Sequence, residues 1–194
     1  FSYSERERLL RITIPASAAL HDTLWISYSG EFTLTGDPDT TGQSMLEQSQ
    51  VPVQEMTADY AYALGGLWFP SLPDDGGIRT LELNITVPDG FAVAATGDST
   101  GTRMNGDSTV TYNYSSRSYG PFYNTGSFSV ARYKQYKRTI GTVGVTVYSL
   151  PRVYGSDNAK RIDKIFGMVG VILDYYRELN GGVAYPWKEL RIVE

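Results

Sequence analysis

Apolar and polar residues alternate with a period of two along most of the first 150 residues, a pattern that predicts β-strands. The clearest alternation runs over residues 79–87, where Leu, Leu, Ile and Val are separated by polar residues. Asn105-Gly106 lies between two further alternating stretches and is a strong β-hairpin signal. The remaining predicted strands cover residues 10–14, 24–34, 58–69, 91–96, 128–133 and 143–148.

Two segments depart from this alternation. Residues 35–57 are rich in Gly, Pro, Asp and Gln and keep no period, which predicts an exposed insertion loop. Over residues 156–179, eight apolar residues recur every three or four positions, which predicts an amphipathic helix. Ser156-Asp157-Asn158 would cap its start, and Asn180-Gly181-Gly182 would end it. A strand over residues 190–193 is predicted to follow.

The change of pattern near residue 151 predicts how the chain is organised. Residues 1–150 are expected to form a mainly β, antiparallel sandwich or saddle domain whose core comes from its own strands. Residues 151–194 are expected to supply a linker, a helix and a strand that begin a second, α+β domain, because a helix and a single strand rarely close a sandwich. The chain opens on Phe1, so we expect it to be a piece of a longer polypeptide.

The amino-acid composition excludes several kinds of functional site and partner. The 194 residues include no Cys and one His, which excludes disulfides, thiolate metal sites, a cysteine nucleophile and a multi-histidine zinc site. The net charge of −4 gives no overall attraction to nucleic acid or to an anionic membrane, and no apolar run is long enough for a transmembrane helix. The abundance of Tyr, Thr and Gly fits a bacterial envelope or extracellular location slightly better than the cytosol.

Charged candidates for a site are better explained by turn chemistry. His21, beside Asp22 in a predicted turn, has no partner histidine and is expected at the surface. Two Asp pairs could be calcium ligands or catalytic carboxylates, but both lie in stretches rich in Gly and Pro where Asp favours turns. These pairs are Asp37 with Asp39, and Asp74 with Asp75. We assign no residue of the chain to a catalytic, cofactor-binding or metal-binding role.

Aromatic candidates are better explained by packing. A sugar-stacking platform is conceivable for Trp25, Trp68 and Trp187, but their apolar and Pro neighbours favour a core or a domain interface. Tyrosines at 112, 114, 119 and 123 are expected to cover a sheet face rather than to stack on a ligand. Asn84 and Asn113 begin glycosylation sequons, yet both lie in predicted strands, so we expect them to be unmodified.

Two groups of short strings resemble the aminopeptidase N family of zinc metallopeptidases (gluzincins). The family's amino-terminal β-domain has a W-x-P…D turn, a strand ending in V-P, and then A-T-G or S-N-G. The matching strings are Trp68-Phe69-Pro70, Leu72-Pro73-Asp74, Leu83-Asn84-Ile85-Thr86-Val87-Pro88 and Val93-Ala94-Ala95-Thr96-Gly97. The family enters its thermolysin-like catalytic domain through F-G-x-Y-P-Y-x-K-L-x-I-V. The similar strings are Leu173-Asp174-Tyr175-Tyr176 and Tyr185-Pro186-Trp187-Lys188-Glu189-Leu190-Arg191-Ile192-Val193.

The resemblance implies a zinc enzyme as the parent of this chain. In the family, a G-x-M-E-N strand, then HExxH and a distant glutamate ligand follow, and all of these would lie beyond Glu194. It therefore implies zinc in the intact parent, no cofactor in this chain, and no activity of the chain alone. Some family members contact the substrate amine through a glutamine on the strand that corresponds to residues 59–63. This chain has Asp-Tyr-Ala-Tyr-Ala there, which leaves exopeptidase specificity open.

The implied function is that of a non-catalytic amino-terminal domain that walls one side of the peptide-binding cleft. The parent would use a zinc-activated water and a glutamate general base. The partner would be the rest of its own polypeptide, and residues 156–194, expected to lack their sheet neighbours, would favour self-association. The alternative is a stand-alone β-sandwich module that binds carbohydrate or protein. Such a module should be complete without the helix and should present an exposed row of aromatic residues.

Overall fold

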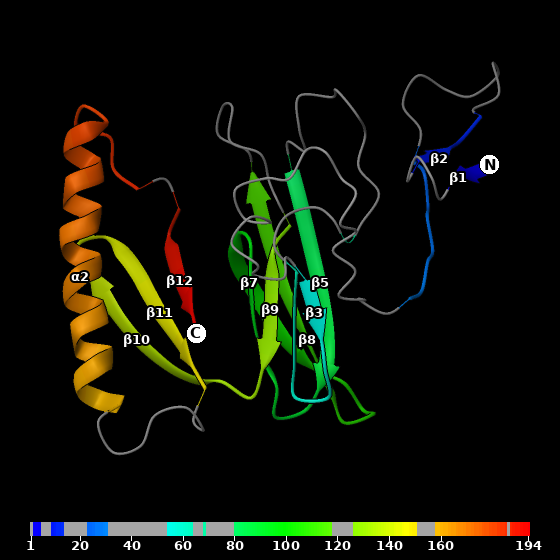
Figure 1. Cartoon of the computed structure of the whole chain (residues 1–194), viewed down its shortest axis with the longest axis horizontal. Helices are drawn as coiled ribbons and strands as arrows, with labels where there is room; N and C mark the ends of the chain where they lie inside the picture. Colours follow the sequence, from blue (N-terminus) through cyan, green and yellow to red (C-terminus); the bar gives the residue numbers. More distant parts are fainter. Residues whose placement is uncertain are drawn as a thin grey trace, which may run out of the picture. The chain divides into compact units, whose positions relative to one another are not determined.

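The structure is a computed structural model that divides into two compact units, Phe1–Phe32 and Thr33–Glu194. It describes residues 2–4, 9–13, 23–30, 54–63, 68, 80–117, 126–150, 158–185 and 187–194 (Figure 1). In the first unit, β1 (Ser2–Ser4) and β2 (Leu9–Arg11) pair antiparallel. Residues 23–30 have no strand structure, so the strand predicted over residues 24–34 is wrong for its described part. The alternation is present there, but a strand also needs a neighbour to bond to.

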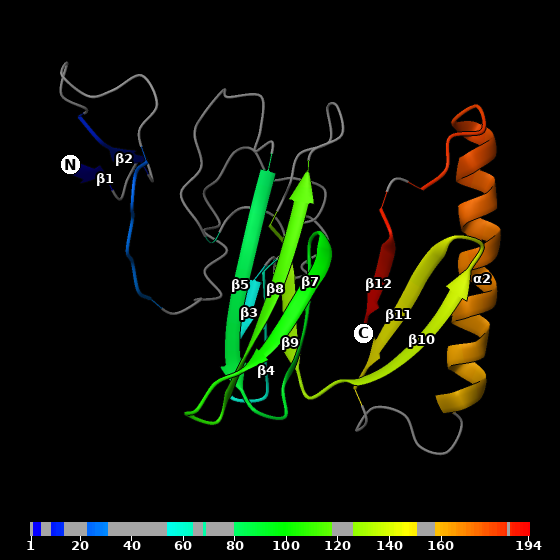
Figure 2. The same cartoon turned by 180° about the vertical axis from the view of Figure 1, so that it is seen from behind.

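Two antiparallel sheets make up most of the larger unit (Figures 1 and 2). One has the strand order β3-β4-β9-β6, and the other has the order β5-β8-β7. The first is built from β3 (Gln54–Met56), β4 (Tyr60–Ala63), β9 (Phe128–Ala131) and β6 (Ala92–Ala95). The second is built from β5 (Thr80–Pro88), β8 (Thr109–Arg117) and β7 (Asp98–Met104).

The alternation in β5 places its apolar residues on one face. Leu83 and Val87 are buried with Tyr114 of β8, and they meet Val93 and Val130 from the other sheet. We call these five residues the sandwich core. Asn105-Gly106 connects β7 to β8 as predicted, and the Asn105 amide donates a 2.8 Å hydrogen bond to the Thr109 carbonyl. The mainly β fold with an antiparallel sandwich is therefore confirmed.

A third sheet carries the only helix described. Its order is β10-β11-β12, with β10 (Lys134–Ile140) antiparallel and β12 (Glu189–Val193) parallel to β11 (Val143–Ser149). The helix α2 (Asn158–Leu179) lies along this sheet and connects β11 to β12 (Figures 1 and 2). Their shared helix–sheet core consists of Val143, Val145, Val147, Ile162, Phe166 and Val169. After α2, the Gly182 amide donates to the Arg177 carbonyl at 2.8 Å and Gly181 has φ 64°, a glycine stop of the predicted kind.

Three expectations need correction. The last residues of the loop predicted over 35–57 form β3, while residues 35–53 lie outside the described residues. The strand predicted over residues 190–193 does not lack sheet neighbours, because β12 pairs with β11. Strands before residue 150 do not pack only with each other, since the valines of β11 pack against α2. The boundary predicted at residues 150 and 151 falls between β11 and α2, and the helix–sheet core extends across it.

Candidate functional site

All of the charged candidates lie outside the described residues, namely His21, Asp22, Asp37, Asp39, Asp74 and Asp75. The candidate tyrosines Tyr119 and Tyr123 lie outside them as well. Within the described ranges, no three His, Asp or Glu side chains come close enough together to hold a metal ion. No helix in the same ranges is long and apolar enough to cross a membrane.

Two of the three tryptophans pack as predicted. The Trp68 ring stands edge-on to Phe128, with centroids 5.3 Å apart, and its Nε1 donates a 2.8 Å hydrogen bond to the Gly126 carbonyl. Trp187 is half-buried, and its ring centroid lies 5.3 Å from that of Tyr185. The packing prediction is wrong for Trp25, which is 89% exposed in the first unit. It lies in residues 23–30, which form no strand.

The described tyrosines and the two glycosylation sequons lie in the strands that the alternation predicts. Tyr112 and Tyr114 face the other sheet, and their hydroxyls donate to the carbonyls of Phe91 (2.9 Å) and Val93 (2.6 Å). The prediction that they cover a sheet face is therefore confirmed for these two tyrosines. Asn84 and Asn113 lie in β5 and β8, as predicted, and are cross-strand partners on the opposite face.

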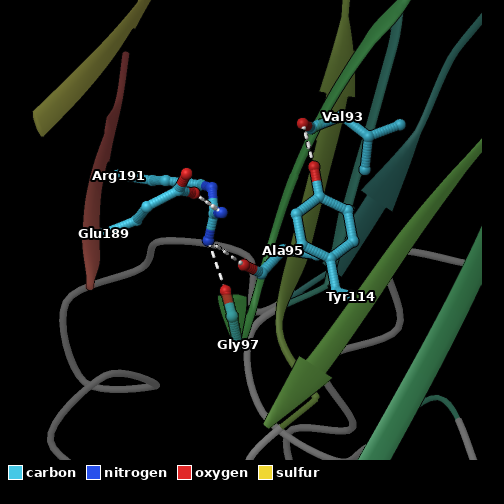
Figure 3. Close-up of polar contacts among 6 residues, drawn as sticks. All are labelled: Val93, Ala95, Gly97, Tyr114, Glu189 and Arg191. Atoms are coloured by element: carbon cyan, nitrogen blue, oxygen red, sulfur yellow. Dashed lines mark hydrogen bonds and ion pairs between the residues drawn. The ribbon is translucent and has the colours of Figure 1, made fainter. Parts of the chain in front are cut away.

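The best-defined polar cluster in the larger unit centres on Arg191 of β12, a residue that the sequence did not single out. Its side chain is only 9% exposed. As Figure 3 shows, Nη1 donates to the carbonyl oxygens of Ala95 (3.3 Å) and Gly97, and Nη2 pairs with the Glu189 carboxylate. The guanidinium carbon lies 4.9 Å from the centre of the Tyr114 ring, which adds a cation–π contact. We call these five residues the Arg191 joint.

Local sequence explains how the joint is built. Arg191 and Glu189 are two residues apart on a strand, so their side chains leave the same face. Gly97 has φ 99°, and a Cβ at this position would lie 2.6 Å from the Ser115 carbonyl oxygen. Both the backbone angle and the close approach to β8 therefore require glycine. This tight turn directs the Gly97 carbonyl towards Arg191.

Buried tyrosines surround the joint. Burial raises the pKa of Tyr114, Tyr148 and Tyr185, and in each case the positive charge of Arg191 opposes that rise. Tyr148 also packs on Ala92 and Ala94 of β6, so the β12 sheet meets the sandwich through an apolar contact as well. A guanidinium keeps its proton at physiological pH, and these phenols keep theirs. The groups are therefore suited to hold β12 in place rather than to transfer protons.

No family model matches the sequence, and no curated protein matches it. Among solved structures, the chain is similar to the crystal structure of the M1 zinc metallopeptidase from Deinococcus radiodurans, with a TM-score of 0.48 and 19% sequence identity. The similarity covers 74% of this chain and 34% of the other. The chain thus spans about a third of the length of that metallopeptidase.

Proposed function

We propose that this chain is the non-catalytic amino-terminal part of a zinc aminopeptidase-like metallopeptidase. In this proposal, residues 1–150 supply a β-domain that helps to shape the peptide-binding cleft. Residues 151–194 begin the catalytic domain, and β10 and β11 form the support on which α2 and β12 pack. The zinc and its ligands belong to the rest of the polypeptide, which is also the partner of this chain.

The observation that carries the proposal is that the two groups of family-like strings touch. Arg191 belongs to the second group, and it donates to Ala95 and Gly97 in the first, 96 and 94 residues earlier in the chain. Their contact supports an origin of both strings in one two-domain protein.

The parallel strand supports the same proposal. A strand, a helix and a parallel strand form a crossover unit, which is typical of α/β and α+β sheets and is not needed to close an antiparallel sandwich. Here β11, α2 and β12 form such a unit around their own core. The string that resembles the family's first catalytic-domain strand is thus a strand inside this unit.

The alternative, a stand-alone binding module, finds less support. Its aromatic row should lie on an outer sheet face, yet the face of β5 that points away from the sandwich core carries Thr80, Glu82, Asn84 and Thr86. On β8, the same outer face carries Thr111 and Asn113. Of the described residues, the exposed aromatic ones are Trp25, Tyr28, Tyr175 and Tyr176, which lie in the first unit and on α2.

The gene provides the first test. The reading frame that follows the Glu194 codon should encode G-x-M-E-N, then HExxH and a later glutamate. The full-length product should contain one zinc ion per chain by mass spectrometry and should hydrolyse aminoacyl anilides, whereas residues 1–194 alone should do neither. A downstream sequence without HExxH, or stoichiometric zinc and hydrolysis in residues 1–194 alone, would disprove the proposal.

A further inference from the structure

We propose that Arg191 is a latch between two independently packed halves of the larger unit, and that its loss frees the halves to move while both stay folded. One half contains the sandwich core and the other contains the helix–sheet core. The inference concerns the chain itself, so it holds or fails separately from the metallopeptidase assignment.

The two cores are distinct. The sandwich core and the helix–sheet core have no residue in common, and the partly buried residues around each are also different. In the described part of the chain, no strand pairing joins the two halves, because β6 and β12 are the edge strands of separate sheets. The halves therefore meet through side chains, where β12 lies beside β6.

Arg191 makes polar contacts between the two halves. Its planar guanidinium donates to two carbonyls of the sandwich half and to a carboxylate of its own strand, while the Tyr114 ring covers one face. The apolar part of the contact is a separate cluster, in which Tyr148 of β11 is buried with Ala92 and Ala94 of β6. Removing this buried cation leaves its partners unsatisfied, because the two carbonyls and Glu189 would each lose a hydrogen-bond donor.

The family string does not specify the latch residue. In the family string K-L-x-I-V, Arg191 occupies the x position, where the string specifies no residue. Gly97 provides the matching half, because its positive φ and tight approach to Ser115 fix the direction of its carbonyl. The joint therefore combines Arg191, at a position where the string specifies no residue, with the turn at Gly97, which only glycine can form.

Distance measurements across the joint test the latch directly. The chain contains no Cys, so two introduced cysteines can be labelled specifically. Spin labels at exposed positions Glu82→Cys of β5 and Lys160→Cys of α2 report the separation of the halves by electron paramagnetic resonance. The labelled full chain is compared with the same chain carrying Arg191→Met, which keeps an unbranched apolar stem but has no hydrogen-bond donors.

A matched control is Arg138→Gln. Arg138 lies on the same sheet, but its 2.7 Å ion pair with Asp163 stays within the helix–sheet half. We expect a narrow distance distribution for the parent chain and for Arg138→Gln, and a distribution at least twice as broad for Arg191→Met. Near-ultraviolet circular dichroism should show that both cores remain packed.

An unchanged distribution in Arg191→Met would overturn the latch. Simultaneous loss of both cores in that variant would also overturn it, because Arg191 would then belong to a single common core. Arg191→Lys provides a second reading, since an ammonium keeps the charge but cannot hold two carbonyls and a carboxylate in one plane. If the distance distribution of Arg191→Lys is broader than that of the parent chain, the latch is supported. If Arg191→Lys and Arg191→Met both keep the width of the parent chain, the latch is overturned.

Discussion

At the scale of single residues, tyrosine hydroxyls connect the two sheets of the sandwich. Tyr114 donates to a carbonyl of β6 and Tyr112 to the carbonyl of Phe91 just before β6, and a phenol can donate only while it keeps its proton. Burial raises the pKa of both groups above the ordinary value of 10.0. Their contribution to the free energy of unfolding must therefore change with pH in the alkaline range.

The direction of that dependence follows from the two states. Below pH 10 both the folded and the unfolded chain hold these protons, so the stabilisation is fully present. Above pH 10 the unfolded chain releases them first, and buried Tyr114 lowers the free energy of unfolding by about 1.4 kcal/mol per pH unit until its folded form also ionises, while half-buried Tyr112 contributes less. Urea unfolding between pH 7 and 11 should show this fall, and Tyr114→Phe should make it shallower. A fall of equal slope in Tyr114→Phe would contradict the assignment.

Trp68 offers a second residue-scale prediction. Trp68→Phe keeps a ring beside Phe128 but removes the donor to the Gly126 carbonyl. We expect the free energy of unfolding to fall by about 1–2 kcal/mol, measured by urea denaturation with circular dichroism. Trp25→Phe is the control, because Trp25 is 89% exposed and should cost less than about 0.5 kcal/mol. Equal effects of the two changes would show that the hydrogen bond contributes nothing.

At the scale of elements, α2 serves as cover for a sheet rather than as an unpartnered tail. Ile162, Phe166 and Val169 face the valines of β11, while the sandwich core contains no residue after Val130. The two parts of the larger unit should therefore respond differently when the helix is removed.

Deletion of residues 156–194 tests this difference. We expect amide hydrogens of β5 and β8 to keep their protection from exchange, because their core is intact. Amide hydrogens of β10 and β11 should exchange freely, because Val143, Val145 and Val147 would lose α2 and β12. Hydrogen exchange with mass spectrometry measures both regions in one experiment. Loss of protection in β5 and β8 as well would mean that the sandwich depends on the helix.

Local signals predicted some elements and missed others for identifiable reasons. The alternation in β5, the turn at Asn105-Gly106 and the apolar spacing in α2 are all short-range patterns, and each matches the structure. β3 is only three residues long, too short to show a period. The pairing of β12 with β11 joins residues about 45 positions apart, and no local pattern records such a partner.

The Arg191 joint was missed for a related reason. Arginine in a short strand is usually exposed, so no sequence pattern indicates that this one is buried. Its partners are backbone carbonyls, which every residue possesses and no sequence motif marks. The only local hint was Gly97, which stands in a string that requires a glycine for its turn.

At the scale of the whole molecule, one face of α2 remains apolar and exposed. Met168, Val171, Ile172, Tyr175 and Leu179 are each at least 46% exposed. In the proposed parent, the rest of the polypeptide would cover them. Residues 1–194 alone should therefore associate as concentration rises.

Sedimentation velocity measures this association. We expect the weight-average sedimentation coefficient to rise between micromolar and hundred-micromolar concentrations, and to stay constant for Val171→Glu, which puts a charge in the middle of the face. Lys137→Glu on exposed β10 is the control for a general effect of charge. Association that persists unchanged in Val171→Glu would place the contact elsewhere.

The long crossover between β11 and β12 also affects how the protein is made. On a ribosome that adds about 5–20 residues per second, β12 emerges on the order of two to eight seconds after β11. During that interval the nascent β10–β11 hairpin lacks its parallel neighbour, and until α2 emerges its valine face is bare. Lys134, Lys137 and Arg138 lie on β10, the edge that would meet another nascent chain. Their charges repel such encounters, so the basic edge guards the hairpin during synthesis.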